Sequence, residues 1–128
     1  MHADDTHAVV FADAEGVIRY WSPGAERLFG YPAAAAVGRS LDLIVPEQFR
    51  EHHWAGFRRA VSTGAAKNSG GRTNIPVLCR DGSVQPFPGA FYFLTDGHGI
   101  GAGAIAVYGD QVGGEQVFGA ILPRPTRG

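Results

Sequence analysis

The stretch GVIRYWSPGAERLFGY, from Gly16 to Tyr31, decides the fold because it joins a strand signal directly to a helix signal. Gly16 to Trp21 is a short apolar run next to turn residues, as is typical of a β-strand. Ser22-Pro23 then supplies an N-cap and a proline at the first helical position. Apolar residues at helical spacing follow, and Gly30 is suited to end the helix. The stretch therefore predicts a strand followed at once by one short helix.

A second apolar run lies just before this stretch. It extends from Ala8 to Ala12, and the residues that separate the two runs, Asp13-Ala14-Glu15-Gly16, favour a tight turn. Two short apolar runs joined by such a turn predict a β-hairpin.

The one long helical pattern of the chain begins after Pro46. We expect a helix from about Glu47 to about Thr63, with Gly64 as its C-cap. Five residues share one narrow face of the helical wheel: Phe49, His53, Gly56, Phe57 and Ala60. We expect this face to bury Phe49, His53 and Phe57 together against the sheet.

Three further strand-like runs follow a glycine-rich loop. They extend from Thr73 to Cys79, from Val84 to Leu94 and from Ile100 to Tyr108, with turn residues between them. Pro86 and Pro88 require the middle run to start late, to bulge or to lie at an edge of the sheet. The order of two strands, helices and three strands predicts an α+β fold, in which short helices and one long helix cover one face of a five-stranded antiparallel sheet.

Composition limits the classes of partner. The 128 residues suit a single domain, and a net charge of −1 with 18% charged residues argues against nucleic acid as a partner. Cys79 is the single cysteine, which excludes an intramolecular disulfide and suits a reducing cytoplasm. No apolar run approaches the ~18 residues of a membrane span, so we expect no membrane association.

The chain divides into three parts on these signals. We expect an N-terminal extension over residues 1–7, the folded domain over 8–110 and a C-terminal tail over 111–128. The tail carries two apolar pairs, Val117-Phe118 and Ile121-Leu122, which one small core does not need. We therefore expect a homodimer or a signalling partner domain.

Four segments spread over the chain carry a family resemblance. Gly16 to Ser22, Glu26 to Tyr31, Val37 to Leu41 and Arg80 to Ser83 strongly resemble the PAS family, and the likeness covers Ala8 to Asp110. The resemblance implies a sensor module whose central cavity holds a small-molecule or gas ligand. PAS folds accept many ligands, so the fold alone does not identify this one.

The long helix resembles one subgroup of that family more closely. Pro46 to His53, with the residues that follow, is similar to the corresponding helix of oxygen-sensing haem PAS kinases. The resemblance implies b-type haem, with His53 as the proximal iron ligand and Arg59 near a haem propionate. Arg72 lies one position short of the distal arginine that contacts the gas in those proteins.

The residue chemistry of His53 is compatible with this role. A neutral imidazole on an apolar helix face offers iron one axial bond, while surrounding side chains such as Phe49, Phe57 and Phe91 keep a porphyrin dry. On the distal side, Gly89 and Phe91 stand where the haem sensors have aliphatic residues. Met1 is the only methionine, which removes the six-coordinate arrangement of histidine and methionine that some haem PAS sensors use. The distal side would then be open, or filled by water, Arg72 or His98.

Other readings of the same residues stay open. His53 could be a structural histidine that makes a hydrogen bond in the core, and the domain could be a dimerisation module that binds another organic ligand or none. A non-covalent flavin is an alternative cofactor, although Ser40 to Ile44 lacks the cysteine of light-sensing flavin domains. Catalysis by haem at an open distal face would use the same residues, whereas no motif of an ordinary hydrolase or transferase is present.

His52 and Trp54 are the two neighbours of His53 on the predicted helix. His52 points about 100° away on the helix, so the two histidines do not share a metal, and we expect His52 at the cavity rim or in solvent. We expect Trp54 to point away from the His53 face and to pack under a loop or in a subunit contact.

Overall fold

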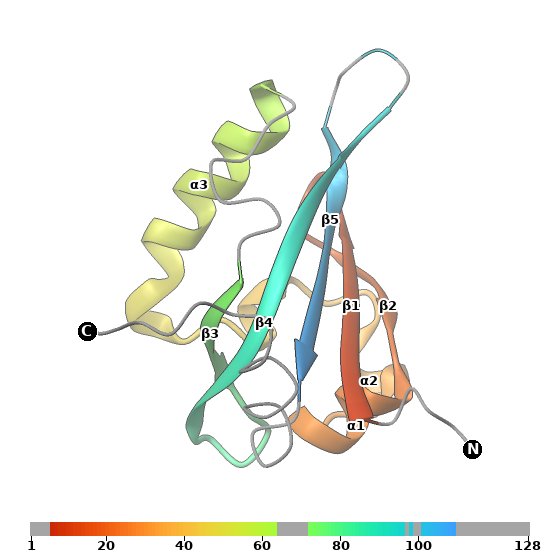
Figure 1. Cartoon of the computed structure of the whole chain (residues 1–128), viewed down its shortest axis with the longest axis vertical. Helices are drawn as coiled ribbons and strands as arrows, with labels where there is room; N and C mark the ends of the chain where they lie inside the picture. Colours follow the sequence, from red (N-terminus) through yellow and green to blue (C-terminus); the bar gives the residue numbers. More distant parts are fainter. Residues whose placement is uncertain (1–5, 64–71, 97, 99–100, 110–128) are drawn as a thin grey trace.

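The computed structural model describes residues 6–63, 72–96, 98 and 101–109, and its elements follow the predicted order (Figure 1). In chain order they are β1 (His7–Asp13), β2 (Ile18–Trp21), α1 (Pro23–Phe29), α2 (Ala33–Ala36), η2 (Leu41–Leu43), η3 (Glu47–Phe49), α3 (Arg50–Thr63), β3 (Arg72–Leu78), β4 (Val84–Thr95) and β5 (Gly101–Gly109). The predicted C-cap Gly64 and the tail 111–128 lie outside the described residues.

The five strands form one antiparallel sheet in the order β2-β1-β5-β4-β3. The last strand, β5, lies at the centre and pairs with every residue of β1, from His7 opposite Gly109 to Asp13 opposite Gly103. Figure 1 shows α1 and α2 at one end of the sheet and α3 alongside its other half. The predicted α+β architecture is confirmed. Among the described residues, no helix combines the length and apolar character needed to cross a bilayer.

The two prolines of β4 lie where this strand has a partner on one side only. Pro86 pairs with Pro76 and Pro88 pairs with Asn74, both on β3, while pairing with β5 begins at Gly89. Proline has no backbone N–H to give to a second neighbour, so it is tolerated at this position. Of the three expected solutions, the structure has the edge-like one: β4 is an internal strand, but the segment with the prolines pairs with β3 alone.

The hairpin and α1 are fixed by side chains that bond to the backbone. Asp13 accepts hydrogen bonds from the backbone N–H groups of Glu15 (2.9 Å) and Val17 (3.0 Å), which closes the turn. Ser22 is the N-cap of α1: its buried hydroxyl accepts from the N–H of Ala25 and, at 2.8 Å, from the N–H of Val9 on β1. The helix start is thereby joined to the sheet.

The core lies between the sheet and the helices. Phe29, at the end of α1, is 1% exposed and makes edge contacts with Trp21, Phe87 and Tyr108, on three different strands. The alternating residues of β1 that face the same way are also buried. The helices therefore cover one face of the sheet.

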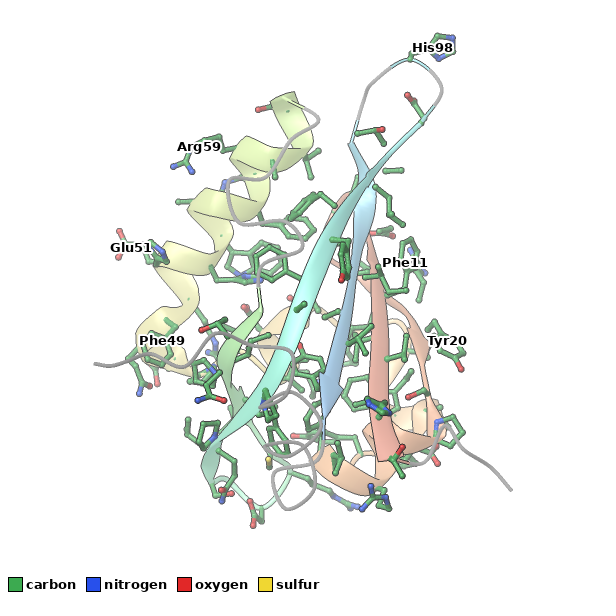
Figure 2. The ribbon with its side chains drawn as sticks, viewed as in Figure 1. Phe11, Tyr20, Phe49, Glu51, Arg59 and His98 are labelled. Carbon is green, nitrogen blue, oxygen red and sulfur yellow. The ribbon has the colours of Figure 1, made fainter. Side chains whose placement is uncertain are left out.

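The long helix begins differently from the prediction. Residues Glu47–Phe49 form a 3₁₀ turn, and the α-helical part starts at Arg50. Phe57 is buried, with 5% of its surface exposed, but Phe49 is 42% exposed, so the expectation that Phe49 packs against the sheet is wrong (Figure 2). A 3₁₀ helix has three residues per turn, so the 3.6-residue spacing of α3 does not continue back through Glu47–Phe49. Phe49 is therefore not on the same face as Phe57.

We predict that Phe57→Ala lowers the free energy of unfolding by about 3 to 5 kcal/mol, because it leaves a cavity between α3 and the sheet. Phe49→Ala is the matched control, and its effect should stay within about 0.5 kcal/mol because the ring is exposed. Urea denaturation of both variants tests this. Equal stability losses would contradict the register of α3.

Candidate functional site

His53 lies on the part of α3 that faces the other aromatic residues. Its ring stacks on Phe57, with centroids 5.8 Å apart, and meets the edge of Trp54 at 4.8 Å and 81°. The Nδ1 atom is buried and has no hydrogen-bond partner among the described residues. A buried polar atom of this kind is unusual in proteins, and a bound group that reached it would satisfy it.

The aromatic contacts continue from α3 to the sheet. Phe57 lies 5.2 Å from Phe93, and Phe93 lies 6.4 Å from Phe91 on the same strand, measured between ring centroids. Two of the predicted cofactor contacts, Phe57 and Phe91, are thus brought into one aromatic cluster with His53. The exposed Phe49 is not part of it.

Trp54 is the residue of this site that sequence reasoning misplaced. We expected it to point away from His53, yet the two rings touch, and its indole Nε1–H donates a 2.7 Å hydrogen bond to the Asp42 carboxylate. The six-membered ring of the indole also covers Gly16, where an added Cβ would lie 2.2 Å from it. The expected position under a neighbouring turn is therefore correct, but the separation from His53 is not.

The surroundings of His53 favour its neutral form. Burial lowers the pKa of the imidazole below its usual value of 6.5, the Asp42 carboxylate opposes this change, and His52 adds to it. Burial disfavours the charged form because a buried imidazolium loses its hydration. A neutral imidazole is the form that binds a metal.

The other predicted residues lie away from this cluster. Arg59 is exposed on α3 and points away from the sheet, and His98 is exposed at the tip of the hairpin between β4 and β5 (Figure 2). His52 is exposed, which agrees with the expected solvent position. Arg72 begins β3 opposite Ala90, but its side chain lies outside the described part. The roles of Arg59 and Arg72 remain predictions.

The residues around His53 fit the chemistry of a haem ligand. The cluster offers one neutral imidazole, a buried nitrogen without a partner, and aromatic walls. The contact between Phe57 and Phe93 occupies the space between α3 and the sheet, so a porphyrin would have to part these rings or lie beside them. Within the described residues, no group of three or more His, Cys, Asp or Glu side chains forms another metal site.

A shallow recess lies at the other end of the sheet. Its volume is about 780 Å³, and its lining includes Arg27, Arg80, Phe87 and Cys79. Burial raises the pKa of the Cys79 thiol, as expected for a small core residue and not for a reactive one. The recess does not include His53.

We predict a pH-dependent stability in the protein without cofactor. The unfolded chain gains a proton on His53 near pH 6.5 and the folded chain only at lower pH, so acidification through this window destabilises the fold. Between about pH 8 and about pH 5.5, His53→Phe should reduce the loss of stability seen in the original protein. Urea denaturation at several pH values measures this, with the exposed and distant His98→Ala as control. Parallel profiles for the original protein and His53→Phe would contradict it.

Comparison with known proteins agrees with this architecture. A model of the PAS fold family matches residues 6–105. The sensor protein FixL of Bradyrhizobium diazoefficiens is 30% identical over 79 residues, which are 62% of this chain and 16% of FixL. The oxygen sensor protein DosP of Escherichia coli is 27% identical over 66 residues, which are 52% of this chain and 8% of DosP. The chain thus spans less than a fifth of these curated relatives.

Among solved structures, the PAS domain of a protein from Colwellia psychrerythraea superposes with a TM-score of 0.68 at 24% identity. The superposition covers 82% of this chain and 86% of that domain. At this identity the likeness supports the fold, and the family match covers most of the sequence. The chain therefore belongs to the PAS fold family.

Proposed function

We propose that this sensory PAS domain binds b-type haem through His53 and senses a diatomic gas or a redox state. The observation that carries the proposal is the buried Nδ1 of His53, which has no hydrogen-bond partner among the described residues and lies inside an aromatic cluster. A buried nitrogen without a partner costs stability, and coordination would offset that cost.

Each residue of the cluster has a definite task in this proposal. Bound haem iron supplies an open coordination position for a gas or a change of oxidation state. His53, kept neutral by burial, would hold the iron. Phe57, Phe91 and Phe93 would exclude water from the porphyrin. The family resemblance gives Arg59 a propionate as partner, and this exposed side chain would have to turn toward the rim of the site to reach it.

The relatives add a biological context to the proposal. One is named a sensor protein and the other an oxygen sensor protein, and the matched segment is a small part of each. By analogy, we propose that this domain acts on an output domain or a partner and leaves the chemistry of signalling to it. We also propose a reducing, cytoplasmic setting, which suits a lone buried thiol.

We predict that His53→Ala abolishes haem binding, seen as loss of the Soret absorption band, or changes the coordination of the haem iron. His52→Ala and His98→Ala should leave most of the haem spectrum unchanged. His53 alone among these three is partly buried in the aromatic cluster, and the other two are exposed. Absorption spectra after haem titration measure the outcome, and circular dichroism confirms that each variant is folded.

Two results would contradict the proposal. A folded original protein that gives no haem spectrum after titration would exclude haem as its ligand. An unchanged spectrum in His53→Ala would place the iron on another residue.

The second candidate function is a PAS interaction module that dimerises and binds another small ligand, such as a flavin or an organic metabolite, or none. The observation that favours it is the outer face of the sheet, away from the helices. This face carries exposed Tyr20, Tyr92 and Leu94, and strand pairing sets Ile105 opposite Tyr92. An apolar face of this kind commonly binds a partner. The apolar pairs of the tail, residues 117–118 and 121–122, lie outside the described residues.

We predict that the double variant Tyr92→Ser and Leu94→Ser converts a homodimer into a monomer, because it removes two exposed apolar side chains from the outer face. Val37→Ser, which removes an equally exposed apolar residue elsewhere, is the control. Light scattering at high protein concentration measures the mass. A monomeric original protein would exclude this candidate's homodimer.

A further inference from the structure

We infer that Asp42 and Trp54 are positioning residues for His53: Asp42 holds the indole of Trp54, and the indole fixes the orientation of the His53 imidazole. This inference deepens the proposed function, since it names what orients the haem ligand. It concerns residues of this chain in direct contact, so it can also be tested without haem.

The indole of Trp54 is fixed at both ends. Its Nε1–H donates to Asp42 Oδ1 at 2.7 Å, and its six-membered ring lies directly over Gly16, whose missing side chain makes room for it. The indole makes edge-on contacts with the rings of Phe57 and His53, at centroid distances of 5.3 Å and 4.8 Å. A ring held by one hydrogen bond and by contacts on several sides has little freedom to rotate.

Asp42 is itself held in place within a short segment. The hydroxyl of Ser40 accepts a 3.1 Å hydrogen bond from the Asp42 backbone N–H, and Arg50 Nε lies 3.8 Å from the Asp42 carboxylate. The guanidinium of Arg50 also donates to the carbonyl oxygens of Asp42 (3.2 Å) and Val45 (3.0 Å). The acceptor that holds Trp54 is therefore part of a rigid corner that leads into α3.

The need for such a device follows from the His53 ring. A histidine that binds a metal is usually oriented by a hydrogen bond from its second nitrogen. Neither ring nitrogen of His53 has a hydrogen-bond partner in the described part of the chain, so whichever nitrogen binds a metal, the other lacks this orienting bond. The orientation of the ring must then come from packing, and the two rings in contact with it are Trp54 at 81° and Phe57 at 30°. Asp42 controls the first of these.

The test without haem uses the indole N–H signals in nitrogen-15 NMR spectra. In Asp42→Ala, the Trp54 Nε1–H should exchange with solvent about tenfold faster or more, since a hydrogen bond to a charged group is lost. The His53 ring signals should shift or broaden in the same variant. Trp21, whose Nε1–H donates to the Tyr31 carbonyl at 2.7 Å, is an internal control in each spectrum and should not change.

Further variants keep the test decisive if Asp42→Ala unfolds. Asp42→Asn keeps an acceptor oxygen and should retain most of the protection, whereas Trp54→Phe removes the donor and should alter the His53 signals. Asp81→Asn changes a carboxylate that bonds to Ser83 in a distant turn, and it should alter neither. Unchanged His53 signals in folded Asp42→Ala or Trp54→Phe would overturn the inference.

The test with haem distinguishes this inference from the proposed function. Haem titration should give the same stoichiometry for Trp54→Phe as for the original protein, but with a broadened or shifted iron–histidine vibration in the Raman spectrum. A sharp, unshifted vibration in Trp54→Phe would overturn the positioning role and leave haem binding intact. If the original protein binds no haem while Asp42→Ala still disturbs the His53 signals, the proposed function fails and the positioning of His53 is supported.

Discussion

Phe29 contacts the edges of Trp21 at 5.8 Å, Phe87 at 5.1 Å and Tyr108 at 5.0 Å, and these three contacts join α1 to strands from both ends of the chain. Because β5 lies between β1 and β4, the sheet is complete only when the last strand of the domain is inserted at its centre. Burial of apolar surface is the main favourable term in folding. Phe29, 1% exposed, is the ring through which α1 and strands β2, β4 and β5 share one buried core.

The Phe29 core leaves the α3 end of the sheet free for a different task. There the rings of His53, Phe57 and Phe93 pack in series, and one of them carries a buried nitrogen without a partner in the described residues. An unsatisfied buried polar group costs about 1 to 3 kcal/mol, which a domain can tolerate only when the remainder is well packed. The buried core around Phe29 therefore offsets the cost of the unpartnered nitrogen at the α3 end.

The elements that could be predicted from sequence are those with local causes. Ser22 caps α1 by accepting from the N–H of a residue three positions away. Pro86 has no N–H to donate, which predicts that its part of the strand pairs on one side only. The predicted burial of Phe49 was wrong because a 3₁₀ turn before Arg50 breaks the helical period, and nothing in the sequence marks where that turn ends. The hydrogen bond between Asp42 and Trp54 joins η2 to α3, with η3 between them in the chain. It depends on tertiary packing and has no sequence signal.

The chemistry of His53 restricts the ligand more than the fold does, since PAS folds hold many kinds of molecule. A group that reaches the buried Nδ1 must coordinate it or form a hydrogen bond, and the rings of Phe57 and Trp54 disfavour any ligand atom that carries an uncompensated charge. Iron in a porphyrin is a coordinating centre inside a flat, largely apolar disc, so it meets both conditions. A flavin is also flat, but it would have to turn a polar edge toward α3 to reach the nitrogen. In the proposed function the unpartnered nitrogen is the atom that a metal centre would use, whereas a purely stacked organic ligand would leave it without a partner.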